Sequence, residues 1–236
     1  MATVTPQFTT RQHLQVLNGF LAKSDGKDKL TALIQYACLF LSAGEPGSIK
    51  KVQASVTAAR KVFRVMRPLE AIMPIINQPG FTGNSPKLVQ AVNKLKSALM
   101  AIYFGADHFV WAYQIGLISD KTTGERMQKL SLWAWALGSV ATIGVEAYNI
   151  AATQVVQGKD ESDESYNMRV DEARKAINQK MLVLVHACFQ AALAGGLLQV
   201  VPFKPRTVGL IGCIASAMNC YFLLPAYPAQ AKAKTA

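Results

Sequence analysis

Residues 48–67, SIKKVQASVTAARKVFRVMR, combine six basic residues with regularly spaced apolar residues and contain no acidic residue. When each residue is turned by about 100° from the last, as in an α-helix, the stretch separates into two faces. The basic face consists of Lys50, Arg60, Lys61, Arg64 and Arg67, with Lys51 as the exception, and the apolar face of Ile49, Val52, Val56, Val62, Phe63 and Met66. The pattern predicts one amphipathic helix, with a break at Arg67 because Pro68 disfavours helix in the residue before it.

The composition of the whole chain favours a membrane protein. Hydrophobic residues make up 51% of its 236 residues, charged residues only 17%, and mean hydropathy is +0.19. Soluble proteins carry about 25% charged residues. The net charge of +11 is concentrated before residue 97, where 13 basic residues face 4 acidic ones. Such a basic segment attracts phosphate backbones or lipid head groups.

The second half of the chain contains long apolar runs. Residues 181–203 and 207–224 carry no formal charge and are joined by the turn PFKPR. A run of about 18 or more such residues can span a bilayer. Residues 97–119 and 130–158 are also apolar, apart from Asp107 and His108 in the first and Glu146 in the second. We therefore predict two to four membrane spans.

The predicted fold class is all-α, a membrane-associated bundle with N-terminal amphipathic helices and two to four C-terminal hydrophobic helices. Residues 1–86 form a basic, cytosol-facing region, in which a first helix runs from Ser24 or Asp25 to just before Gly44 and residues 73–86 form a loop. Residues 87–158 are membrane-embedded or membrane-apposed, and 159–180 a polar connector. Residues 181–225 form a transmembrane hairpin and 226–236 a cytosolic tail.

The sequence does not predict an enzyme, a metal site or a cofactor. Its three histidines are scattered, and Asp107 and His108 are adjacent, so their side chains leave a helix on different faces. Neither the four cysteines nor the glycines follow a zinc or phosphate-loop pattern. The pairs Gly195–Gly196 and Gly209–Gly212 instead predict close helix packing.

Between nucleic acid and a membrane, the two-faced helix favours the membrane. A helix with one basic and one apolar face suits an anionic lipid interface, where each Lys or Arg contributes about 1 kcal/mol and the apolar face is buried. We expect no nucleic-acid partner. The alternative is that Val52, Val56 and Phe63 pack in the protein's own core while the basic face is solvated.

Three ordered blocks then resemble the peroxin eleven family of peroxisomal membrane proteins. They are SDGKDKLTALIQYACLFLS (24–42), AARKVFRVMRPLEAI (58–72) and YFGADHFVWAYQIGLI (103–118). The residues that carry the resemblance are Gly26, Asp28, Lys29, Leu30, Gln35, Tyr36, Ala59, Arg60, Lys61, Phe63, Arg64, Tyr103, Asp107, Trp111 and Gly116.

The resemblance implies a multi-pass peroxisomal membrane protein with both termini in the cytosol, and hence an even number of spans. It also implies an N-terminal amphipathic helix that enters one leaflet and promotes curvature, elongating and proliferating peroxisomes. Homo-oligomers and recruitment of the fission machinery, a dynamin-related GTPase and its adaptors, are implied as well. Lys232 and Lys234 in the tail resemble a dilysine signal read by coatomer.

Two alternative functions remain open at this point. The apolar helices would form a pore for small metabolites, with Asp107, His108 and Glu146 along a polar path. Alternatively, the protein is an adaptor whose cytosolic helices only recruit fission proteins.

Overall fold

The structure, a computed structural model, describes residues 8–83 and 85–227. These residues form helices and no strands, so the all-α prediction is confirmed. The helices are α1 (Thr10–Leu21), α2 (Ser24–Ser42), α3 (Ser48–Val62), α4 (Arg67–Asn77), α5 (Lys87–Gln114), α6 (Lys121–Ala152), α7 (Asp163–Leu197) and α8 (Pro205–Leu223).

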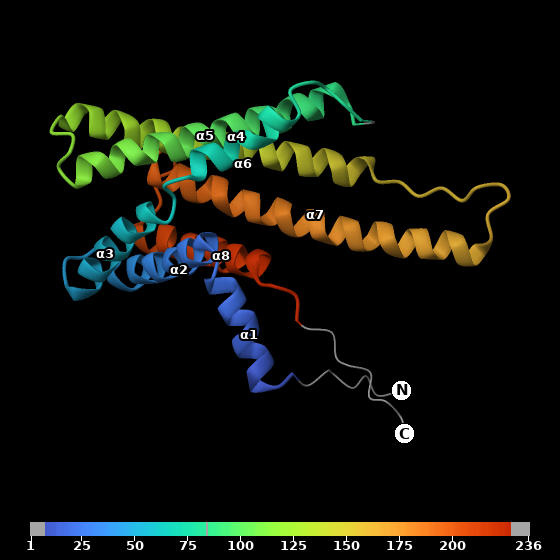
Figure 1. Ribbon diagram of the computed structural model, residues 1–236, viewed down its shortest axis with the longest axis horizontal. Coiled ribbons are helices and arrows are strands. Elements are labelled where there is room, and N and C mark those ends of the chain that lie inside the picture. Colours follow the sequence, from blue (N-terminus) through green and yellow to red (C-terminus); the bar gives the residue numbers. More distant parts are fainter. Residues whose placement is uncertain (1–7, 84, 228–236) are drawn as a thin grey trace.

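The helices form two groups that are joined by α7 (Figure 1). In one group α5 and α6 form a long hairpin, with α4 packed on α5. In the other, α2 packs on α8 and α3 packs on α2, while α1 projects from the start of α2. Helix α7 contacts both α6 and α8, and so lies between the groups. Direct contact between the groups is otherwise slight and involves α3 and α5.

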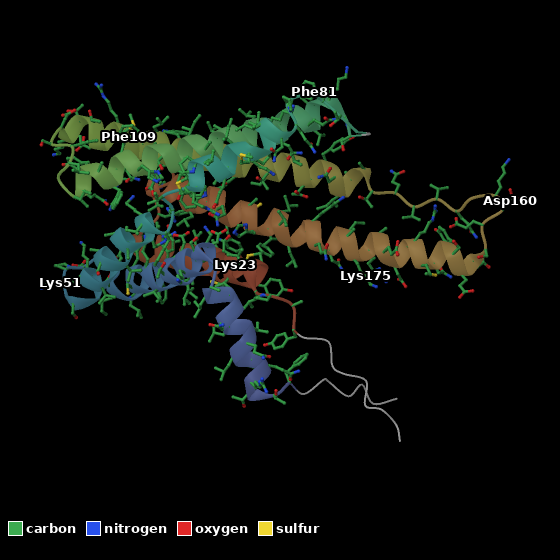
Figure 2. All side chains as sticks on the ribbon, in the orientation of Figure 1. Lys23, Lys51, Phe81, Phe109, Asp160 and Lys175 are labelled. Carbon is green, nitrogen blue, oxygen red and sulfur yellow. The ribbon has the colours of Figure 1, made fainter. Side chains whose placement is uncertain are left out.

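Three of these helices, α6, α7 and α8, are long and apolar enough to cross a membrane. The apolar runs predicted at 130–158, 181–203 and 207–224 lie mostly in them, whereas the run at 97–119 lies mostly in α5, which does not qualify. The polar connector predicted at residues 159–180 is helical from Asp163 and forms the first half of α7. Figure 2 shows this half, with Lys175, extending away from the bundle beside the loop that carries Asp160.

The predicted end of the first helix is confirmed. Helix α2 ends at Ser42, followed by two residues with left-handed backbone, Ala43 (φ 52°) and Gly44 (φ 87°). Its start also agrees, although Asp25 lies in the first turn and does not cap the helix. There its negative charge still interacts favourably with the positive end of the helix dipole, which stabilises the helix.

The helix predicted over residues 48–67 is shorter than expected. Helix α3 ends at Val62, the chain turns, and α4 begins at Arg67. Pro68 lies in the first turn of α4, where its missing N–H costs nothing and its fixed φ suits a helix. The loop predicted from residue 73 is also wrong as far as Asn77, because Pro74 is accommodated inside α4.

Helix α1 was not predicted, although its start carries a sequence signal. The Thr9 hydroxyl accepts a hydrogen bond from the Gln12 backbone N–H, and the Gln12 side chain accepts one from the Thr9 N–H. This reciprocal pair is a capping box, whose Thr-x-x-Gln pattern is readable in a sequence.

Helices α2 and α8 pack closely because two glycines of α8 lie at their contact. A methyl group added at Gly209 would overlap the backbone of Phe40, and one at Gly212 would overlap the ring of Tyr36. The predicted close packing is thus observed at both glycines. Since α8 reaches the rest of the bundle through α2 and α7, this contact holds its group together.

We predict that Gly209→Ala destabilises the protein by about 1–3 kcal/mol, because the backbones of α2 and α8 must separate to admit the methyl group. Gly144→Ala is the matched control, since a Cβ at this helical glycine of α6 meets nothing within 4 Å. Thermal unfolding of the detergent-solubilised protein measures both. Equal unfolding temperatures for the two variants would contradict the close contact.

Candidate functional site

The cationic residues at the end of α3 point into the protein. Arg60, Lys61 and Arg64 are only 8%, 8% and 7% exposed. The exposed basic face that we expected is therefore wrong for these three residues. The physical reason is that two buried carboxylates, on α2 and α5, provide partners, and a buried charge is tolerated when it is paired and hydrogen-bonded.

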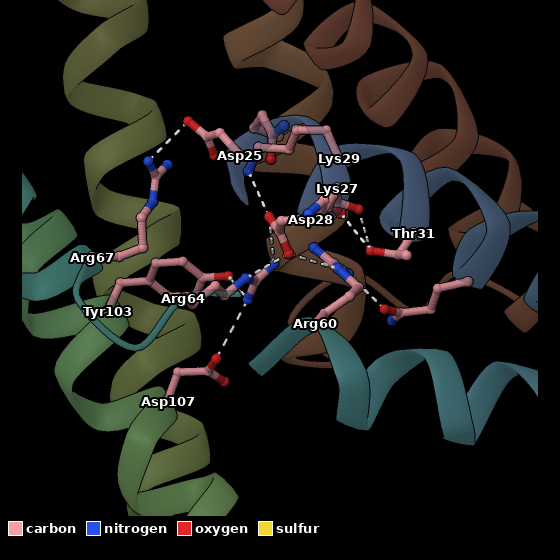
Figure 3. A network of polar contacts seen from close by, with 12 residues as sticks. Asp25, Lys27, Asp28, Lys29, Thr31, Arg60, Arg64, Arg67, Tyr103 and Asp107 are labelled. Atoms are coloured by element: carbon pink, nitrogen blue, oxygen red, sulfur yellow. Dashed lines mark hydrogen bonds and ion pairs between the residues drawn. The ribbon is translucent and has the colours of Figure 1, made fainter. Parts of the chain in front are cut away.

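Asp28 of α2 is the centre of the cluster (Figure 3). Its Oδ1 accepts hydrogen bonds from Arg60 Nε at 3.0 Å and from Arg64 Nε at 2.8 Å. Its Oδ2 accepts from Lys29 Nζ at 3.1 Å and from Arg64 Nη2 at 3.4 Å. Asp28 itself is 2% exposed. One carboxylate thus fixes both arginines against α2.

Arg64 carries the connection on to α5. Its Nη1 donates to the Tyr103 hydroxyl at 3.0 Å and to Asp107 Oδ2 at 3.4 Å. Lys61 pairs with the other oxygen of Asp107. Arg60 donates to the Gln35 side-chain oxygen on α2. The cluster therefore links α2, α3 and α5, and so joins the two helix groups at the place where their direct contact is slight.

Burial and charge act in opposite directions on the central carboxyl. Burial raises the pKa of Asp28, but the charges of Lys29, Arg64 and Arg60 outweigh it and hold that pKa well below the ordinary 3.8. Burial also raises the pKa of Tyr103 to about 12, so its hydroxyl is neutral and accepts from Arg64. Asp28 therefore stays ionised at any physiological pH.

The rest of the predicted basic face is more accessible. Arg67 pairs with Asp25 at 2.8 Å and Glu70 at 3.0 Å, with a quarter of its side chain exposed. Lys50 is exposed and donates to the Gly44 carbonyl at 2.7 Å. Its neighbour Lys51 lies at the outer end of the α2–α3–α8 group (Figure 2).

The predicted apolar face is largely on the outside. Ile49, Val52 and Met66 are 41%, 48% and 62% exposed, while Val56 and Phe63 are half-buried. Packing of this face in the protein's own core, the alternative left open by the sequence, therefore applies only in part. The helix has the two faces that the periodicity predicts, but Arg60, Lys61 and Arg64 face inward and most of the apolar residues face outward.

The three residues proposed for a pore are not brought to one place. Asp107 is engaged by Lys61 and Arg64 and lines a central cavity, which His108 and Glu146 do not line. The His108 ring contacts the Phe104 carbonyl through Nδ1, and its buried Nε2 has no partner among the described residues. Lys232 and Lys234 lie outside the described residues. Within those residues, no group of three His, Cys, Asp or Glu side chains is placed to hold a metal ion.

Comparison with known proteins places this chain in a family. The family model of Peroxisomal biogenesis factor 11 matches residues 14–224, which include the whole ion cluster and all three apolar helices. The chain belongs to this family. The resemblance to the peroxin eleven proteins is thereby confirmed, and this peroxin eleven protein is a peroxisomal membrane protein whose family functions in peroxisome proliferation.

Curated plant relatives match over nearly their full length. Peroxisomal membrane protein 11C of Arabidopsis thaliana is 32% identical, with 93% of this chain and 96% of the relative covered. Peroxisomal membrane protein 11-1 of Oryza sativa subsp. japonica is 30% identical, with 95% and 97% covered. Peroxisomal membrane protein 11E of Arabidopsis thaliana is 31% identical, with 93% and 95% covered. No solved structure matches this peroxin eleven chain.

We predict that Asp28→Asn destabilises this peroxin eleven protein by about 3–5 kcal/mol, because it leaves two buried guanidinium groups without their shared carboxylate. Asp171→Asn is the matched control, an exposed carboxyl on α7. Resistance of the solubilised protein to proteolysis during heating measures both. A variant as resistant as the control would show that the cluster does not hold the two helix groups together.

The same substitution has a predicted pH dependence. Because the folded-state pKa of Asp28 is lowered, its ionised form contributes stability above the ordinary carboxyl pKa near 3.8, and this contribution is lost as pH falls below that value. The stability difference between the wild-type protein and Asp28→Asn should therefore be constant from pH 7 to about pH 5 and shrink in more acidic buffer. Unfolding midpoints of both proteins, measured across this range, test the sign of this pH dependence. A stability difference that grows as the buffer becomes more acidic would contradict the prediction.

Proposed function

We propose that this protein elongates and remodels the peroxisomal membrane through the outward apolar surface of α3 and α4, and so promotes peroxisome proliferation and fission. The observation that supports this most is the run of exposed apolar side chains along these helices. We call it the α3–α4 apolar surface, and it consists of Ile49, Val52, Val62, Val65, Met66, Leu69, Met73 and Ile76.

Water is a poor environment for such a surface, whereas a lipid leaflet is a favourable one. Each of these side chains is 36% or more exposed, and together they line helices attached to a protein with three long apolar helices. Shallow burial of an amphipathic helix in the interface expands one leaflet and favours positive curvature. The apolar helices keep α3 and α4 at the membrane and so raise their local concentration there.

The cations have a different role from the one their sequence pattern indicates. Arg60, Lys61 and Arg64 do not reach out to head groups but orient α3 by binding to α2 and α5. Lys50 and Lys51 are exposed at the start of α3. We propose that these two lysines contact acidic head groups, each contributing about 1 kcal/mol to the free energy of membrane binding.

Topology and partners belong to the same proposal. With both termini in the cytosol an even number of helices crosses the membrane, and we choose α7 and α8, which contain the two uncharged runs. Homo-oligomers then make the curvature collective. Recruitment of a dynamin-related GTPase with its adaptors completes fission, and coatomer reads Lys232 and Lys234.

We predict that Val52→Ser together with Met66→Ser abolishes tubulation of vesicles that contain acidic phospholipid, because the double variant loses apolar contact without touching the ion cluster. The full-length protein is reconstituted, and tubules are counted by electron microscopy. Leu14→Ser with Leu17→Ser on α1 is the matched control, since both leucines are similarly exposed. The control should tubulate like the wild type.

The adaptor alternative gives a different result in this assay. A protein that only recruits fission proteins leaves purified vesicles round, with or without the serine substitutions. Tubulation by the wild-type protein alone therefore favours membrane remodelling. If correctly folded wild-type protein forms no tubules, the remodelling proposal is rejected.

A further inference from the structure

A cavity of about 860 Å³ lies where the two helix groups and α7 meet, with walls contributed by α2 to α8. This volume is within the range of about 300–1,000 Å³ that is usual for small-molecule sites. The cavity lies inside the bundle, apart from the α3–α4 apolar surface, so a ligand bound there would be independent of the proposed membrane remodelling.

Polar side chains of the three apolar helices gather on this cavity. On α6 they are Gln128, Ser131, Ser139 and Thr142, on α7 His186 and Gln190, and on α8 Ser216 and Asn219. Polar residues are rare in membrane-embedded helices, face inward, and mark ligand or ion sites. From Gln128 to Thr142 the cavity follows α6 for about 21 Å, at 1.5 Å per residue. It is therefore long enough for a chain-like ligand.

One wall of the cavity carries surplus positive charge. Within the ion cluster, the four cations Lys29, Arg60, Lys61 and Arg64 share only two carboxylates. Adding the remaining charged lining residues, Arg67, Lys96, Asp25 and Glu70, still leaves six cations against four acids. Buried charge without full compensation is costly, so an anion in the cavity would be favourable.

Lys96 is the lining cation best placed to accept such a ligand. It is half-buried on α5 and lies two helical turns from Tyr103 on the same face. It forms no ion pair within residues 8–83 and 85–227. Lys96 therefore lines the cavity without a carboxylate partner among the described residues.

The wall formed by α6, α7 and α8 also carries apolar side chains beside the polar ones. Leu132 and Trp135 of α6, Leu193 and Leu197 of α7, and Phe222 and Leu223 of α8 line it. A site with cations on one side and aliphatic and aromatic side chains on the other is complementary to an amphipathic anion.

We propose that this cavity binds an acyl chain with a carboxylate or phosphate head group. The head group compensates the surplus positive charge of the wall formed by Lys96 and the ion cluster. The chain lies along the apolar side chains that α6, α7 and α8 present to the cavity. If each methylene takes about the ~30 Å³ of a water molecule in the liquid, a chain of ~16 carbons needs roughly 500 Å³, which the cavity provides.

The test uses the full-length protein in maltoside micelles and a fluorescent polyene fatty acid, whose emission rises in an apolar site. We expect saturable binding above that of protein-free micelles. An unlabelled fatty acid should displace the probe, and its uncharged methyl ester should not. A lysophospholipid with a phosphate head group is the second competitor. If only the fatty acid or only the lysophospholipid displaces the probe, the head group that the cavity binds is identified. If both displace it, the cavity binds either head group.

Two variants locate the binding in the cavity. Lys96→Gln should weaken probe binding by about tenfold, because it removes a charge-assisted contact. Lys87→Gln, an exposed lysine on the same helix, should leave binding unchanged. Thr142→Trp should block binding by filling the cavity, with its unfolding temperature showing that the bundle is intact. Equal displacement by the methyl ester, or unchanged binding in both Lys96→Gln and Thr142→Trp, would overturn the proposal.

Discussion

The sharing of Asp28 by Arg60 and Arg64 is the interaction on which the arrangement of the helices depends. The carboxylate lies on α2, the arginines at the end of α3 and just beyond it, and Arg64 continues to Tyr103 and Asp107 on α5. Apart from α7, the direct packing between the two helix groups is slight. A buried ion cluster contributes less to net stability than to specificity, because desolvation offsets much of the attraction. What it fixes here is the position of α3.

That position explains why the helix has its charged face inside and its apolar face outside. In water such a helix would turn its apolar face inward and its charged face outward, because burying apolar surface is favourable by about 25 cal/mol per Å². In our proposal both faces are accommodated beside a membrane, because the lipid covers Val52 and Met66 while the carboxylates of α2 and α5 neutralise the arginines. In our proposal the protein therefore presents an apolar surface to the leaflet without exposing the charges that hold this surface in place.

The same cluster also forms one wall of the central cavity. Four cations and two carboxylates leave positive charge inside the bundle, and the polar residues of α6, α7 and α8 face the same space. One feature thus connects the orientation of α3, the joining of the helix groups and the preference of the cavity for an anion. Substitutions in the cluster would alter all three properties together, whereas Lys96 affects only the cavity, and Val52 and Met66 affect only the α3–α4 apolar surface.

The sequence by itself determined the all-α class, the apolar runs and the family. Periodicity of residues 48–62, the glycines of α8 and the lack of charge in residues 181–203 and 207–224 are local properties, and local physics predicts them. The tertiary structure decided which face of α3 meets which environment. The 100° periodicity separates Arg60 from Val52 but is the same for either orientation, and the partners that choose between them, Asp28 and Asp107, lie 32 and 46 residues away from their cations. Pairing over such separations depends on how α2 and α5 pack, which no local pattern of residues records.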